Sequence, residues 1–205
     1  MNLRYPLLLI AAILLADQAL KIYIKTTMML GESFSMGGDW FYISFVENNG
    51  MAFGFEFAGV YGKYFLSIFR IIAVCFLMYY LIKLVKKGNV HKGVIYSLSL
   101  IFAGALGNII DSVFYGVIFS DSFNQVATLF PAEGGYAPLL QGRVVDMFYF
   151  PIIESRFPSW FPFWGGEDFT FFSPVFNIAD AAISVGIGIL LIYQKHFFKE
   201  ISEKA

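Results

Sequence analysis

Four aspartates, each close to an asparagine or lysine or set in an apolar run, are the residues best suited to chemistry. They are Asp17 with Lys21, Asn108 with Asp111, Asp146, and Asn177 with Asp180. Spacings of three or four residues place the paired side chains on one helical face. Two close carboxylates in a partly dry site share a proton near neutral pH. Such a pair can activate water against a peptide carbonyl and protonate the leaving amine, but the residues alone leave open which two aspartates meet.

Other catalytic patterns are missing. The sequence has no His-Glu-x-x-His, and His91 and His196 lie near the predicted cytoplasmic ends, which argues against a zinc site. It has no Gly-x-Ser-x-Gly and no Gly-x-x-x-x-Gly-Lys, and the lone Cys75 has no partner for a disulfide. We therefore expect carboxylate chemistry with no metal and no cofactor. A structural ion pair is an equally good interpretation of Asp17 and Lys21.

The composition indicates a membrane protein. Of 205 residues, 58% are hydrophobic and only 14% are charged, whereas a soluble domain has about a quarter charged residues. The net charge of −1 gives no indication of nucleic-acid binding. A membrane-spanning helix needs roughly 20 mostly apolar residues. The sequence therefore predicts one membrane domain, 1–205, with spans at about 5–24, 64–85, 94–119 and 175–198.

The Lys and Arg residues indicate the orientation, because cytoplasmic flanks are enriched in them. Most of them fall on one side of four crossings, so both termini are predicted to be cytoplasmic and the segments 25–63 and 120–174 to lie outside. In these outer segments, Phe41–Phe45 resembles a strand and Gly50–Gly54 a turn. The aromatic stretch Phe148–Phe176 is either an interfacial belt or a platform for a lipid-embedded substrate.

Five motifs in order make the chain resemble the lipoprotein signal peptidases, the type II signal peptidases of the aspartyl peptidase family. They are Asp17-Gln18 with Lys21, Asn48-Asn49-Gly50-Met51-Ala52-Phe53-Gly54, Gly104-Ala105-Leu106-Gly107-Asn108 with Asp111, Val144-Val145-Asp146, and Phe176-Asn177-Ile178-Ala179-Asp180. The resemblance covers nearly the whole chain. It implies an all-α membrane fold of four transmembrane helices, with a small extracytoplasmic β cradle and a short interfacial helix.

The same resemblance implies an aspartic endopeptidase of the bacterial inner membrane, with its active site at the periplasmic side. Such an enzyme removes the signal peptide from diacylglyceryl-modified prolipoproteins, cutting before the lipidated cysteine. Membrane lipid and globomycin-type inhibitors are implied partners, and the chain is expected to be a monomer that binds no nucleic acid. By motif, the catalytic pair is Asp146 and Asp180. The implied supporting or substrate-binding residues are Asp17, Lys21, Asn48, Gly50, Asn108, Asp111, Asn177 and Ala179.

The chain departs from the family pattern at several positions. Ser112 stands where the family usually has Arg, so the ion pair of that Arg must be absent or supplied elsewhere, with Arg143 as one candidate. Met147 replaces the usual Phe and Met51 the usual Ala. Two outer segments are long, 120–142 and 151–174, and we hypothesise that they form a lid or docking surface.

Three other functions compete with a peptidase. A proton-linked transporter or channel also uses membrane carboxylates, but here they gather at one membrane level and no internal repeat is present. A presenilin-like protease would need Gly-x-Gly-Asp within a helix, which the sequence lacks. A non-catalytic scaffold would not need both Asp146 and Asp180.

Overall fold

The computed structural model describes residues 2–49, 59–151, 153–171 and 174–202. Within these residues, four helices are long and apolar enough to cross a membrane, which confirms the prediction of four transmembrane helices. Their bounds are Arg4–Thr27 (α1), Gly59–Lys87 (α2), Lys92–Ile110 (α3) and Ile178–Ser202 (α5). A π-helical turn, Asp111–Tyr115 (η2), and a short turn, Gly116–Ile118 (α4), extend α3 to the length of the predicted third span.

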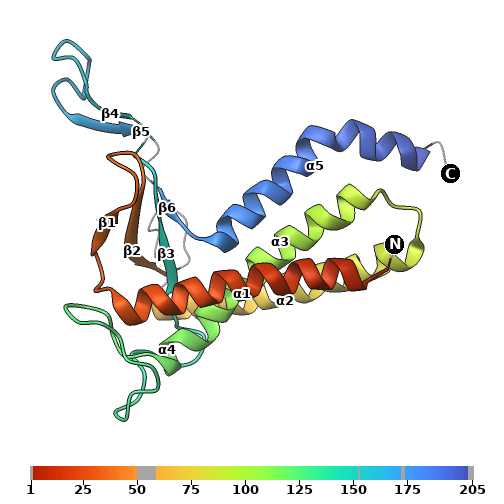
Figure 1. The fold of residues 1–205 in the computed structure, drawn as a ribbon, viewed down its shortest axis with the longest axis horizontal. Helices are drawn as coiled ribbons and strands as arrows, with labels where there is room; N and C mark the ends of the chain where they lie inside the picture. Colours follow the sequence, from red (N-terminus) through yellow and green to blue (C-terminus); the bar gives the residue numbers. More distant parts are fainter. Residues whose placement is uncertain (1, 50–58, 152, 172–173, 203–205) are drawn as a thin grey trace.

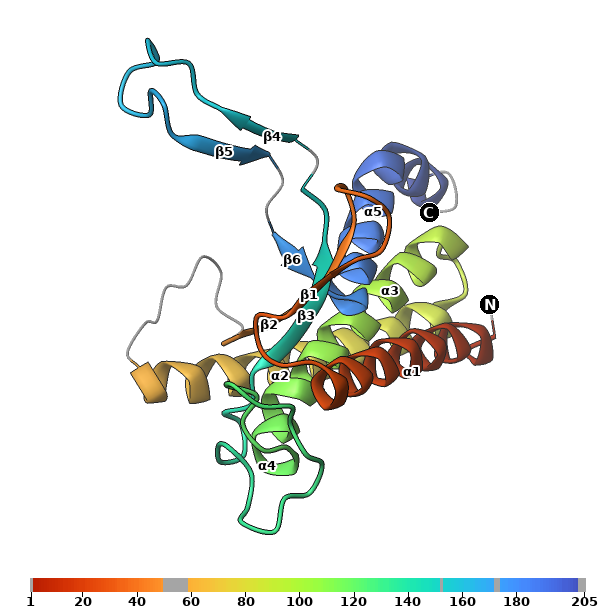
Figure 2. The ribbon, with the colours of Figure 1, turned by 60° about the vertical axis from the view of Figure 1, so that its left-hand side comes forward.

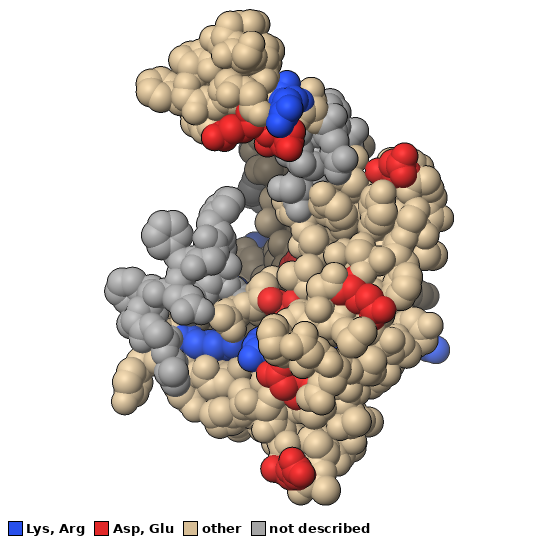
Figure 3. Space-filling view, turned by 90° about the vertical axis from the view of Figure 1, so that its left-hand side faces the viewer, with Lys and Arg blue, Asp and Glu red and all other residues tan. Residues whose placement is uncertain are grey.

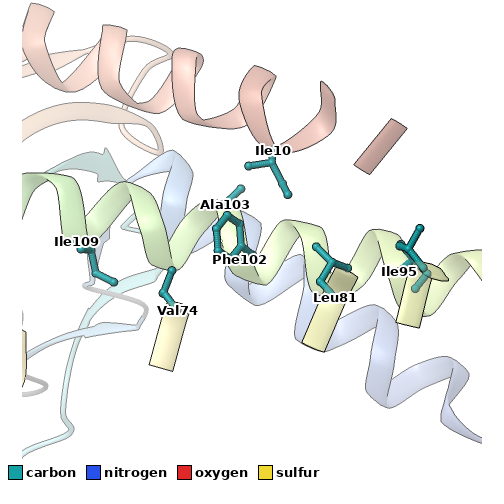
Figure 4. Packing of buried hydrophobic residues seen from close by; sticks show 8 residues of the cluster. Ile10, Val74, Leu81, Ile95, Phe102, Ala103 and Ile109 are labelled. Atoms are coloured by element: carbon teal, nitrogen blue, oxygen red, sulfur yellow. The ribbon is translucent and has the colours of Figure 1, made fainter. Parts of the chain in front are cut away.

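Helix α3 is the centre of the bundle, because it packs against α1, α2 and α5 (Figures 1 and 2). Ile10 of α1, Val74 and Leu81 of α2, and Phe102 and Ala103 of α3 are buried in one apolar cluster (Figure 4). Large apolar side chains also cover the outer faces of the helices, as expected where lipid is the solvent. Burial against α3 therefore fixes where the other three helices lie.

Small residues let α3 and α5 approach closely, as the sequence predicts. A Cβ added at Gly104 would lie 2.1 Å from the backbone oxygen of Ala179, and one at Gly107 would lie 2.8 Å from Asp17 Oδ2. Small residues at helix contacts in membranes permit such approach of two backbones. The two glycines thus bring the start of α5 against the polar faces of α1 and α3.

A small antiparallel sheet lies at one end of the bundle, and α1 begins and α5 ends at the opposite end (Figure 1). Its strand order is β1-β2-β3-β6, with bounds Ser33–Ser35 (β1), Tyr42–Asn48 (β2), Val144–Tyr149 (β3) and Val175–Phe176 (β6). Strand β2 confirms the strand expected near Phe41–Phe45. In the register of β2 and β3, Val46 faces Asp146 and Asn48 faces Val144. The short interfacial helix stays a prediction.

The second long outer segment forms a projecting hairpin of β4 (Ile153–Arg156) and β5 (Asp168–Phe171) (Figure 2). Arg156 and Asp168 form an exposed ion pair where the two strands meet their connecting loop. Its tip carries exposed Trp160 and Phe163, and Figure 3 shows no Lys, Arg, Asp or Glu there. A role of this hairpin in docking stays a prediction.

The first long outer segment packs against the end of α3. The carbonyl oxygens of Ser112 and Gly116 accept hydrogen bonds from the N–H groups of Gly142 and Ala137, at 2.9 and 3.0 Å. A π-helical turn and a helix end leave carbonyl groups without partners in their own helix, and this segment supplies them. Ser112, which stands where the family usually has Arg, is buried, and its hydroxyl donates to the Asn108 carbonyl at 2.9 Å.

The fourth helix begins at Ile178, three residues later than predicted. Val175 and Phe176 are apolar and fit either a helix or a strand, and here they pair with Tyr149 and Phe148 of β3. Asn177 then ends the strand and caps the helix.

Replacing Gly104 by alanine should push α5 away from α3, because the new Cβ would overlap the Ala179 carbonyl. Overpacking typically costs about 1–3 kcal/mol, so we expect the midpoint of thermal unfolding in detergent to fall by several degrees. Gly188→Ala is the matched control, since a Cβ there meets nothing within 4 Å and alanine favours the helix. Equal midpoints for both variants would contradict close packing of α3 on α5.

Candidate active site

Asp146 lies on β3 and is 2% exposed. Its Oδ1 accepts a hydrogen bond of 2.6 Å from Asn177 Nδ2, and its Oδ2 accepts one from Asn48 Nδ2 of the neighbouring strand β2. A buried carboxylate needs such partners, because burying an unpaired charge is costly. Both oxygens of Asp146 are therefore held by neutral amides, one from each side.

Asp180 lies in the first turn of α5, where the start of the helix favours a negative charge. Its backbone N–H donates to Asn177 Oδ1 at 2.8 Å, and its Oδ2 accepts from the Asn177 N–H at 3.4 Å. This reciprocal arrangement is a capping box. Asn108 of α3 adds a 2.8 Å hydrogen bond from its Nδ2 to Asp180 Oδ1. Local sequence and helix packing together orient the Asp180 carboxylate.

Asn177 contacts both carboxylates and is fully buried. Its side-chain amide donates to Asp146 Oδ1, while its backbone N–H donates to Asp180 Oδ2. The same amide also donates to Asn108 Oδ1 at 3.1 Å and to the Val145 carbonyl at 3.2 Å. One residue thus joins the sheet, α3 and α5 between the two aspartates.

Lys21 neutralises the other two aspartates in the membrane. Its ammonium lies 3.0 Å from Asp17 Oδ2 and 2.8 Å from Asp111 Oδ2, and all three side chains are at most 1% exposed. It also donates to Asn108 Oδ1 at 2.9 Å. The predicted pairing of Asp17 with Lys21 is confirmed, and Asp111 shares the same cation. Gln18 donates to Asp111 Oδ1 at 2.9 Å and completes the cluster.

Asp17 and Asp111 each hold a backbone group of the site. Asp17 Oδ1 accepts from the N–H of Ala179 at 2.9 Å, at the start of α5 where helix N–H groups lack partners. Asp111 Oδ2 accepts from the N–H of Val145 at 3.3 Å, next to Asp146. The Lys21 cluster therefore attaches to both elements that carry the candidate catalytic carboxylates.

A second charged network surrounds Glu47, the neighbour of Asn48 on β2. Glu47 pairs with Lys25 of α1 and with Arg143, whose Nη1 lies 3.0 Å from Glu47 Oε2. Lys25 also donates to Ser122 Oγ at 2.7 Å, and Arg143 pairs more weakly with Asp121 at 3.4 Å. Arg143, the candidate for supplying the ion pair of the family Arg, pairs with Glu47 and Asp121. It helps to hold β2 against the start of β3.

A pocket of about 250 Å³ opens where α2, α3 and α5 meet. Asn108, Asp180 and Arg70 are its polar lining residues, and the rest of the lining is aliphatic. Burial, together with the charge of Asp180, raises the pKa of Asp146 to about 7, against the smaller opposing effects of Lys21 and the two amides. Asp180 thus lines this largely aliphatic pocket, and its charge acts on the buried Asp146.

The structure brings together nearly all the predicted site residues. Asp17, Lys21, Asn48, Asn108, Asp111, Asp146, Asn177, Ala179 and Asp180 all belong to one hydrogen-bonded cluster. Gly50 lies outside the described residues. Lys25, Glu47 and Arg70 were missed as candidates. The lone charge of Arg70 in an apolar stretch was a usable signal, but nothing in the sequence paired Lys25 with Glu47.

Among the described residues, no group of three or more His, Cys, Asp or Glu side chains is placed to hold a metal ion. The four aspartates are held by a lysine, amides and backbone N–H groups. What the arrangement offers is two interacting carboxylates beside an apolar pocket in a polytopic membrane protein.

Comparisons with known proteins agree with this class. The family model described as Signal peptidase (SPase) II matches residues 9–196. The lipoprotein signal peptidase of Porphyromonas gingivalis is 58% identical over 184 residues, covering 90% of this chain and 80% of the relative. That of Amoebophilus asiaticus is 34% identical over 202 residues, covering 98% and 80%.

Solved structures add the fold. A bacterial membrane enzyme solved at 1.9 Å has a TM-score of 0.59 and 28% identity, covering 93% of this chain and 92% of its own. A second, with a TM-score of 0.58 and 24% identity, covers 98% and 92%. The chain belongs to the signal peptidase II family. It is a multi-pass bacterial membrane protease that removes signal peptides from prolipoproteins.

Replacing Lys21 by methionine should destabilise the fold strongly, because Asp17 and Asp111 would remain buried without a cation. Removing one partner of a buried ion pair costs about 3–5 kcal/mol. Thermal unfolding in detergent measures the loss, with Lys83→Met, an exposed lysine of α2, as the control. Adding Asp111→Asn to Lys21→Met should recover part of it. A loss under about 1 kcal/mol for the single variant would refute the role of Lys21.

Proposed function

We propose that the chain is an aspartic endopeptidase whose catalytic pair is Asp146 and Asp180. The observation that supports this most strongly is Asn177, whose side chain holds Asp146 while its backbone N–H contacts Asp180. Asp111 is the competing partner on sequence grounds, but it is occupied by Lys21 and Gln18. The hydrogen bonds that Asp146 and Asp180 accept come from side-chain amides and a backbone N–H group, which are neutral.

The chemistry follows from one proton shared by two carboxyl groups. The ionised carboxylate takes a proton from water as the water oxygen attacks the peptide carbonyl carbon. The protonated carboxyl donates a hydrogen bond to the carbonyl oxygen, which carries the developing negative charge. The carbon–nitrogen bond then breaks, and the leaving amine takes a proton from the pair. Because the pair titrates as a unit, acid and base are not assigned to individual residues.

The substrate is a prolipoprotein with a diacylglyceryl-modified cysteine, and cleavage falls just before that cysteine. The aliphatic lining of the pocket suits an apolar signal segment, and lipid around the helices suits the acyl chains. The same pocket is the proposed site for globomycin-type inhibitors. A single chain carries both carboxylates and all their described hydrogen-bond partners, which fits a monomeric enzyme.

The sheet-bearing end of the bundle faces the periplasm in this proposal, and the protein lies in the inner membrane. Lys83, Lys86 and Lys87 at the end of α2 and Lys92 at the start of α3 lie at the opposite end. Basic residues on short flanks indicate the cytoplasmic side, so both termini are cytoplasmic. Asp146 and Asp180 then lie at the end of the bundle that meets the periplasmic surface of the inner membrane.

Replacing either Asp146 or Asp180 by asparagine should lower kcat for a lipidated prolipoprotein by at least about a hundredfold, because one carboxyl can no longer exchange the proton. Cleavage by purified protein in detergent or vesicles measures this. Asp39→Asn, a change of an exposed aspartate, is the matched control. Near-wild-type turnover in either variant, with cleavage still at the lipidated cysteine, would refute the assignment.

The rate should fall as the pH rises above about 7, because the pair then loses its last proton from a carboxyl whose pKa burial and Asp180 raise to that value. The hydrogen bond from Asn48 favours the charged form of Asp146 and so lowers its pKa. Asn48→Ala should therefore move the alkaline limb of kcat/KM to higher pH. A limb that stays in place or moves to lower pH would contradict this account.

A further inference from the structure

Arg70 is a charged residue that the proposed chemistry does not use. It is the one Lys, Arg, Asp or Glu between Tyr64 and Ile82, in the apolar stretch of α2. A charged side chain within a membrane span is costly and therefore marks a function more often than not. Asp146 and Asp180 already have hydrogen-bond partners from Asn48, Asn108 and Asn177, none of which requires Arg70.

Arg70 lies on the wall of the pocket that also contains Asn108 and Asp180. The remaining lining residues are aliphatic and come from all three helices: Ala73, Val74, Ala105, Ile109 and Ile183. The charge of Asp180 acts on Arg70, so the guanidinium and the carboxylate lie within electrostatic range. The pocket thus has an acidic group from α5 and a cationic donor from α2, and most of its other lining side chains are aliphatic.

A signal-peptide helix that enters this pocket requires hydrogen-bond donors for the carbonyl groups at its C-terminal end. As an apolar helix in lipid, it satisfies its own backbone except for the last four carbonyl groups, which have no partner in the helix. Attack on the scissile bond at the aspartates requires that the helix end just before that bond. The unpartnered carbonyls then lie in the pocket, where lipid offers no hydrogen-bond donor.

A guanidinium is better suited than other side chains to donate hydrogen bonds to these carbonyl groups. Arginine near a helix C-terminus binds the last carbonyl oxygens and interacts favourably with the negative end of the helix dipole. Its planar group has five N–H donors and stays charged in an apolar setting. Arg70 can therefore serve several carbonyls of a bound helix at once.

We infer that Arg70 is a substrate-binding residue whose guanidinium donates hydrogen bonds to the carbonyl oxygens at the C-terminal end of the signal-peptide helix. This inference rests on the proposed function, because it requires cleavage at Asp146 and Asp180. Because Arg70 belongs to α2, its binding to these carbonyl groups would hold the end of the substrate helix at a fixed distance from the two carboxylates. Specificity for an apolar helix followed by an extended segment follows from that placement.

The first test is steady-state cleavage of a synthetic diacylglyceryl-modified prolipoprotein peptide. Arg70→Leu should raise KM about tenfold or more with a smaller change in kcat, because a charged hydrogen bond to substrate is lost. Arg70→Lys keeps the charge and should recover part of the effect. Phe76→Leu, on the exposed face of α2, is the control and should leave KM unchanged.

Measuring the binding of the peptide directly shows whether Arg70 contacts the substrate or acts only through the charge of Asp180. In the Asp146→Asn background, adding Arg70→Leu should weaken binding of the same peptide about tenfold or more. Unchanged KM and unchanged binding would overturn the inference, as would a shifted pH profile with KM unmoved, which would place the action of Arg70 on Asp180. If Arg70→Leu does not fold, Arg70→Gln, which loses the charge and the fork of donors, is measured against the same criteria.

The inference and the proposed function fail in different ways. If the peptide is cleaved normally by Asp146→Asn or Asp180→Asn, the proposed function fails. If those variants are inactive while Arg70→Leu binds and cleaves like the wild type, only the role of Arg70 fails.

Discussion

The site depends on the position of Asn177. This residue ends strand β6, caps helix α5 and is fully buried between Asp146 and Asp180. The chain turns from β6 into α5 at this residue, and the capping box with Asp180 fixes that turn, while the Asn177 side chain binds Asp146 on β3. Because the Asn177 amide donates to Asp146, Asn108 and the Val145 carbonyl, a movement of α5 would disturb the whole site.

The rest of the bundle holds that turn in place through buried carboxylates, whose negative charge must be compensated. Lys21 compensates Asp17 and Asp111, and those two carboxylates hold the N–H groups of Ala179 and Val145. Gly104 lets α5 come close enough for these bonds to form. The Lys21 cluster therefore supports the elements that carry Asp146 and Asp180, and Asp180 lines the pocket.

The sequence predicted what depends on local spacing and hydrophobicity. Apolar runs gave the four spans, and the four-residue spacing of Asp17 and Lys21 gave their ion pair. Contacts between distant segments could not be predicted: Lys25 lies in α1, Glu47 in β2 and Arg143 in the loop before β3, and no sequence pattern pairs them. The start of α5 was also ambiguous, since Val175 and Phe176 suit a strand or a helix until their pairing with β3 is known.

The central claim is that Asp146 and Asp180 hold one proton between them near neutral pH. Infrared difference spectroscopy of the carboxyl C=O stretch, recorded against pH, measures this directly. The account predicts one protonated carboxyl per molecule below about pH 7, lost as the pH rises through that value, whose signal changes in both Asp146→Asn and Asp180→Asn. Two carboxyl groups that titrate independently, each unaffected by replacement of the other, would contradict it.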